Sequence, residues 1–363
     1  MLLSVEDFET ALTFARAYDR RFNDDGRMVL EVAHIAQNSG SNVAERAYQF
    51  VIAKGPGSQF YFDARMGLLS YYYQRITTSV MVDEIALLAL EREFESLLNS
   101  RPITVRSVRL IRDWARISAF YRNDFQKADS LLRVAKNIPN LPRRILADLR
   151  MDLADIYLFR GEPWEATLLY SQVETEFRHD EIGFEARFRN ARLFYYIGEF
   201  EWSLTHLDVL RAATSKLIAN DAMAMSLLIR ENMGDDARHA LTLFARADLL
   251  IYQRKYDEAL AIFDKIMSPV GAPLQDNVLM KRAEIALKRG NPEDALNYLE
   301  RIYMFFTDGF LADDALFLAA RINEEQLNKP LAAVALYEQL ILEHPSSLHI
   351  PEARRRFQEL RRR

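Results

Sequence analysis

Apolar residues along this chain recur at the three- and four-residue spacing of amphipathic helices, and the helical stretches come in pairs joined by short polar turns. The clearest pair spans residues 147–178. Apolar side chains share one face of each helix: Leu153, Ala154 and Tyr157 on the first, and Ala166, Tyr170 and Val173 on the second. The turn at residues 160–163 reads Arg-Gly-Glu-Pro, with a glycine for a left-handed helix end and a proline for the next helix start. The pattern predicts a helical hairpin.

This hairpin pattern repeats along the chain. A small residue follows each turn, and a large apolar residue comes four places later; the small residues are Ala128, Ala166, Ser203, Ala259, Ala295 and Ala333. Neighbouring members lie 36 to 38 positions apart, except that 56 positions separate Ser203 from Ala259. A period in this range is typical of a solenoid, in which each hairpin buries its apolar face against its neighbours. We expect the extra length between residues 210 and 239 to hold an additional helix.

The order of residues within each copy resembles the tetratricopeptide repeat (TPR) family. Across the copies the recurring order is a small residue and a large apolar residue on the first helix, then a turn that in several copies contains glycine. An aromatic residue, an alanine or serine and, in some copies, a terminal proline follow. The resemblance covers residues 109–363, although the family's signature Trp and first-helix Gly are mostly missing. It implies an all-α fold, a right-handed α-α superhelix of helical hairpins. We expect the TPR-like superhelix over residues 106–363, closed by a C-terminal capping helix. Degenerate hairpins over residues 1–105 either continue it or form a separate body.

Composition agrees with this fold class and excludes several kinds of chemistry. Only 12 Gly and 11 Pro in 363 residues argue against a sheet-rich fold with many tight turns. A formal net charge of -5 gives no reason to expect nucleic acid as a partner. The absence of Cys excludes disulfides, thiolate metal sites and cysteine nucleophiles. No apolar run approaches the roughly 18 residues that a transmembrane helix needs.

Catalytic and cofactor motifs are also missing. The six His residues show no His-Glu-x-x-His or similar metal-ligand spacing. Residues 54–57, Lys-Gly-Pro-Gly, lack the Gly-Lys-Ser/Thr ending of a phosphate loop, and no Gly-x-Ser-x-Gly elbow is present. We therefore expect no metal, no cofactor and no enzymatic activity.

The resemblance implies that defined first-helix positions line the concave face of the superhelix. In this chain those positions carry acids and apolar groups, so a basic clamp for a carboxylate is disfavoured. Such a groove suits an extended or helical segment of another protein, with aromatic and Met anchors. The predicted groove residues are Met151, Asp155, Phe188, Arg192 and Tyr195.

Two functions stay open on this basis: a non-catalytic protein-interaction scaffold, or a regulatory peptide- or ligand-binding module of a larger protein. Residues 7–22 read as the second helix of a hairpin, so we expect the chain to be a fragment of a longer protein. Residues 336–354 resemble the ends of bacterial cell-envelope TPR proteins. We accordingly expect a periplasmic or envelope location if an export signal precedes the fragment, and a cytoplasmic one otherwise. No pattern indicates an oligomeric state.

Overall fold

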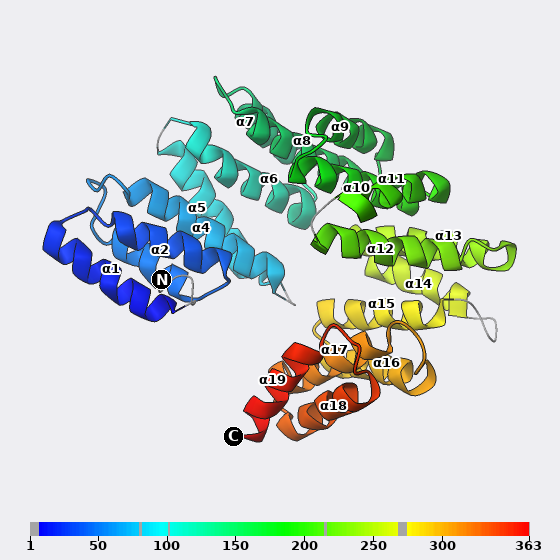
Figure 1. Cartoon of the computed structure of the whole chain (residues 1–363). Coiled ribbons are helices and arrows are strands. Elements are labelled where there is room, and N and C mark those ends of the chain that lie inside the picture. Colours follow the sequence, from blue (N-terminus) through cyan, green and yellow to red (C-terminus); the bar gives the residue numbers. More distant parts are fainter. Residues whose placement is uncertain (1–6, 80–81, 101, 214–215, 268–273, 363) are drawn as a thin grey trace. The chain divides into compact units, whose positions relative to one another are not determined.

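The computed structural model describes residues 7–79, 82–100, 102–213, 216–267 and 274–362. Within these ranges the chain is helical apart from short turns, and no strand occurs. Successive helices pack against each other as hairpins, which are visible in Figure 1 as paired ribbons. The predicted fold class, an all-α solenoid of helical hairpins, is confirmed.

The chain divides into two compact units, residues 1–156 and residues 157–363, and each is described by itself. The first unit contains α1 (Phe8–Phe22), α2 (Arg27–Asn38), α3 (Val43–Ile52), α4 (Tyr61–Thr78), α5 (Glu84–Asn99), the 3-10 helix η2 (Val105–Ser107), α6 (Val108–Arg122), α7 (Phe125–Lys136) and most of α8 (Arg143–Arg160). Helices α2 and α3 pair closely, as do α6 and α7, while α4 lies beside both α2 and α6. The weak hairpins expected before residue 105 are therefore present.

The second unit continues the hairpin pattern. It contains α9 (Pro163–Glu176), α10 (Glu181–Tyr196), α11 (Phe200–Ala213), α12 (Lys216–Glu231), α13 (Asp235–Tyr252), α14 (Tyr256–Met267), α15 (Gln275–Lys288), α16 (Pro292–Phe305), α17 (Ala312–Glu325), α18 (Pro330–Glu343) and α19 (Ile350–Arg361). Helix α12 packs on α11 and is the additional helix expected between residues 210 and 239. Helix α19 packs on α18 as the expected C-terminal helix.

The turns and the small residues fix the hairpin geometry as the sequence predicts. Gly161 has φ 87°, a left-handed conformation that lets α8 end, and α9 begins at once with Pro163. Each small residue that opens a second helix is fully buried, which allows the paired helices to approach closely. Ser203 fits this scheme because its hydroxyl donates to the carbonyl of Ala191 at 2.8 Å, so no buried polar group is left unsatisfied.

The boundary between the compact units, at 156/157, differs from the boundary read from the sequence, at 105/106. One apolar cluster runs without interruption from Leu69 to Ile156, across residue 105. The sequence boundary at 105/106 marks instead where the repeats begin to match the TPR pattern. That boundary stays a prediction about repeat similarity, while the compact units meet inside α8.

Candidate functional site: an arginine pocket on the first unit

A row of arginines follows one face of η2 and α6. Its members, Arg106, Arg109, Arg112 and Arg116, are spaced by three, three and four residues. Residues at this spacing lie above one another on the same side of a helix. We call this row the arginine ladder. It places four guanidinium groups along one side of about two and a half helical turns.

The lower half of the ladder is Arg112 and Arg116, and the upper half is Arg106 and Arg109. The lower half is paired with acids on α8. Arg112 contacts Asp152 and lies 3.5 Å from Asp148. Arg116 lies 3.0 Å from Asp152 and 4.0 Å from Asp155. Asp152 is only 1% exposed, so its charge depends on these partners. Burial by itself lowers the pKa of Arg112, but the adjacent Asp152 outweighs burial and leaves that pKa above its ordinary value.

The upper half of the ladder opens into a cavity of about 380 Å³, the arginine pocket. The pocket is lined by the four ladder arginines together with Tyr73 of α4, Asp113 of α6 and Ile145 of α8. Arg106 reaches only the partly exposed Asp63, at 3.5 Å. Arg109 is exposed and makes no ion pair with any residue that the structure describes. The pocket therefore presents one cation, Arg109, that has no ion pair within the described part of the chain.

One acid, Asp113, lies among these arginines. Ser70 of α4 donates its hydroxyl to Asp113 Oδ2 at 3.0 Å. Burial raises the pKa of Asp113 to about 6, although Arg109, the Ser70 hydroxyl and Arg112 act in the opposite direction. Burial also raises the pKa of the Tyr73 hydroxyl, so this group stays neutral and can donate. The pocket can accept an anionic group between its arginines, and its one acid titrates just below neutral pH.

Two of the predicted groove residues lie on α8 in the first unit. Met151 and Asp155 are both buried, and Asp155 faces Arg116 rather than open surface. Asp155 thus supports Arg116 of the ladder, while Met151 belongs to the buried part of α8.

The other three predicted groove residues lie on α10 in the second unit. Tyr195 is 0% exposed, and its hydroxyl has no hydrogen-bond partner among the described residues. Burial raises the pKa of Tyr195 well above its ordinary value. Phe188 and Arg192 are half-buried, and the Arg192 guanidinium lies 5.8 Å from the ring centre of Tyr252. Phe188 and Arg192 retain surface for a ligand, and their role as groove residues stays a prediction.

The arginine pocket is rich in cations, whereas the sequence predicted a binding groove lined by acids and apolar groups. Asp155 lies at a position read from the sequence as ligand-facing, yet it faces Arg116 of the ladder. The ladder itself was missed, although its three-three-four spacing is visible in the sequence. The sequence does not show which face of α6 meets α8. It therefore does not show which of the arginines are paired with acids and which stay available to a ligand.

Other chemistry is not evident in the described part of the chain. It contains no group of three or more His, Cys, Asp or Glu side chains placed to hold a metal ion. None of its helices combines the length and the apolar character needed to cross a membrane.

Comparison with known proteins identifies one repeat by family. A tetratricopeptide repeat model matches residues 314–347, which include nearly all of α17 and the whole of α18. This confirms the TPR resemblance for that hairpin. No curated protein matches the chain.

Two solved structures align with most of the chain. One is the TPR domain of P58(IPK), at 17% identity and a TM-score of 0.28, covering 99% of this chain and 95% of that one. The other is a tetratricopeptide repeat protein from Parabacteroides merdae, at 14% identity and a TM-score of 0.28, covering 92% of this chain and 99% of that one.

Proposed function

We propose that this chain is a non-catalytic protein-interaction scaffold that binds an extended or helical segment of a partner on the face formed by its first helices. In the first unit that face includes α4, α6 and α8, and the arginine pocket lies on it. Stacked hairpins suit this role because the repeats hold side chains in fixed positions along a continuous surface. The observation that carries the proposal is the exposed Arg109, which makes no ion pair with any residue that the structure describes.

The pocket selects for an acidic group on the partner segment. Guanidinium groups bind carboxylates and phosphates with paired, charge-assisted hydrogen bonds. Each such bond contributes about 1.5–3 kcal/mol, which corresponds to about a 10- to 150-fold change in affinity. Arg109 is the group we expect to contact the partner first, because Arg112 and Arg116 are held by Asp152.

Peptide selection with the full chain tests this function. Peptides with random sequences are displayed and selected on the wild-type protein, and the dissociation constants of the selected peptides are then measured for wild type and for Arg109→Gln. We expect the selected peptides to be enriched in Asp, Glu or a C-terminal carboxylate. We also expect Arg109→Gln to weaken them by about 10-fold or more, the loss of one charge-assisted hydrogen bond.

A matched control uses Arg92 of α5, which is equally exposed but lies away from the pocket. Arg92→Gln removes the same charge from the protein and should leave the affinity of these peptides unchanged. Selected peptides without acidic groups, or equal losses in both variants, would contradict the pocket as the binding site. A location in the bacterial cell envelope stays a prediction from the C-terminal resemblance.

A further inference from the structure

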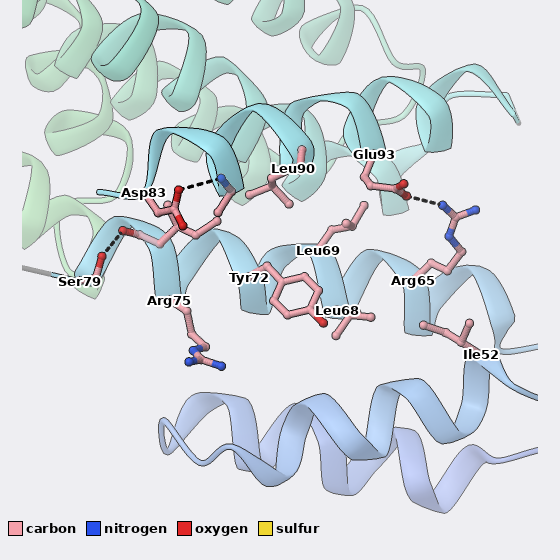
Figure 2. A pocket seen from close by; sticks show the side chains of 13 residues that line it. Ile52, Arg65, Leu68, Leu69, Tyr72, Arg75, Ser79, Asp83, Leu90 and Glu93 are labelled. Atoms are coloured by element: carbon pink, nitrogen blue, oxygen red, sulfur yellow. Dashed lines mark hydrogen bonds and ion pairs between the residues drawn. The ribbon is translucent and has the colours of Figure 1, made fainter. Parts of the chain in front are cut away.

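A second hollow lies on a different side of α4 from the arginine pocket. It is a groove of about 640 Å³ whose floor is α4, with α3 along one side and α5 along the other (Figure 2). Leu68, Tyr72 and Ile76 form the floor at successive four-residue spacing, so the apolar floor is about 12 Å long. The wall on α5 includes the small residues Ala86 and Ala89. We call this hollow the apolar groove.

The apolar surface extends out of the groove over the start of α5. Residues 85–90 read Ile-Ala-Leu-Leu-Ala-Leu, so the first turns of this helix are apolar on every side. Leu87 and Leu90 are buried in the core of the first unit, whereas Ile85 is 80% exposed and Leu88 is 47% exposed. A helix that is apolar all round is normally covered all round. The chain covers only one side of α5. Of the two exposed residues, Ile85 lies one turn before Ala89 of the groove wall, whereas Leu88 lies on the side of the helix away from that wall.

The charges that line the groove differ between its two edges. Arg65 is bound to Glu93 at 2.9 Å across one end of the groove, as Figure 2 shows. The carboxylate of Asp83 is occupied as the N-cap of α5, where it accepts from the backbone N–H groups of Ile85 and Ala86. By contrast, Arg75 has a side chain that is 62% exposed and lies 3.5 Å from Glu45. Arg75 thus presents an exposed cation on α4, while Glu93, whose side chain is 56% exposed, presents an acid on the α5 side.

We propose that the apolar groove binds an amphipathic helix of a protein partner. The helix inserts apolar side chains spaced i, i+3 or i+4, and i+7 along Leu68, Tyr72 and Ile76, and its acidic edge meets Arg75. Ala86 and Ala89 leave room for the backbone of the incoming helix to approach. The exposed Ile85 lies just beyond the groove lining, so an occupant that also covers it must be larger than a small molecule that fills the groove.

This inference does not depend on the proposed function of the arginine pocket. The arginine pocket and the apolar groove share no lining residue. Even the neighbouring residues Tyr72 and Tyr73 of α4 are divided between them, since Tyr73 lines the pocket and Tyr72 lines the groove. Variants of one site therefore serve as controls for the other.

The experiment uses the full chain and a displayed library of helical peptides with randomised apolar and edge positions. Because the chain has no Cys, Ile85→Cys introduces a single thiol at the lip of the groove for an environment-sensitive dye. We expect selection to enrich helices with apolar residues at i, i+3 or i+4, and i+7 and with Asp or Glu at one edge. Their binding should shift the dye emission to the blue as position 85 becomes covered.

Substitutions then locate the binding. Ala89→Glu places a charge in the groove wall at an exposed position, so the fold is retained, and it should weaken the selected helices by about 10-fold or more because the glutamate loses water on binding. Arg75→Gln should weaken them by about 2- to 5-fold, as expected for a partly exposed charge pair. Two control variants should leave binding unchanged: Arg109→Gln in the arginine pocket, and Leu331→Glu on the exposed side of α18.

Three outcomes would overturn the proposal. In the first, the selected helices bind Ala89→Glu as tightly as wild type. In the second, dodecanoate, a probe for small apolar ligands, binds the wild-type chain, displaces the helices and binds Ala89→Glu more weakly. That result would make the groove a site for small apolar molecules. In the third, sedimentation shows a dimer that Ile85→Glu dissociates, which would assign the surface to a second copy of this chain.

Discussion

Asp113 offers a quantitative test of the arginine pocket, because its carboxylate is buried at an energetic cost. The pKa of Asp113 rises from an ordinary value of 3.8 to about 6, chiefly through burial. A group whose pKa is higher in the folded state makes the fold less stable once pH exceeds the unfolded pKa. The shift of about two units corresponds to about 3 kcal/mol at neutral pH, since one unit is worth 1.36 kcal/mol.

Asp113→Asn replaces the carboxylate by a neutral group of the same shape. We expect the variant and wild type to be equally stable below about pH 3, where Asp113 is protonated in both the folded and the unfolded state. The free energy of unfolding of the variant should exceed that of wild type progressively between pH 4 and pH 6. Above pH 6 the gain should level off at up to about 3 kcal/mol, because ionised Asp113 then destabilises only the wild type.

Hydrogen exchange of the backbone amides of α6, compared between the two proteins at each pH, measures this difference locally. Local measurement suits a chain of repeats, since such chains need not unfold as one unit. Asp129→Asn on α7 is the control, because Asp129 pairs with Arg133 at the surface at 2.7 Å. That substitution should change stability by about 0.5 kcal/mol or less. A gain for Asp113→Asn that is independent of pH, or a loss at pH 7.5, would refute the reasoning.

Two further predictions concern packing in the second unit. Gly183→Ala should lower the free energy of unfolding by about 1–3 kcal/mol or more, because a Cβ there would lie 1.9 Å from the carbonyl oxygen of Phe177. The loss is measured as a lower melting temperature. Gly234→Ala, where a Cβ meets nothing within 4 Å, is the control and should melt within a few degrees of wild type. Asn190→Ala should cost about 1–3 kcal/mol in denaturant unfolding, because it removes the acceptor of the Thr167 hydroxyl at 2.6 Å; an unchanged midpoint would show that this buried hydrogen bond is dispensable.

The hairpins could be predicted from the sequence because their signals are local. Gly161 and Pro163 define one helix end and the next helix start within three residues, and Ala166 lies one turn further on. These features are set by backbone conformation and side-chain size, which are independent of the rest of the chain. Even α12, which interrupts the period, was predicted from the extra length between residues 210 and 239.

The candidate site could not be predicted in the same way, because it depends on which helix faces meet. Counting from the repeat pattern makes Asp155 and Tyr195 ligand-facing, whereas α6 covers Asp155 and the core of the second unit encloses Tyr195. A shift of one residue turns a helical side chain by about 100°, so a small error in repeat register exchanges surface for core. The register is set by long-range packing that repeats with degenerate signatures do not specify.

The arginine pocket also shows why net charge is a poor guide to local recognition in this chain. The protein carries an excess of acids, with a formal charge of -5, yet the lining of the pocket contains four arginines and one acid. Asp152 holds Arg112 and Arg116 in place and is itself 1% exposed, so its charge is neutralised within the fold and not presented to a ligand. A partner therefore meets only the charges that are not already paired between helices of the chain. Arg109 is left over, and it is this residue, rather than the overall composition, that favours an acidic partner segment.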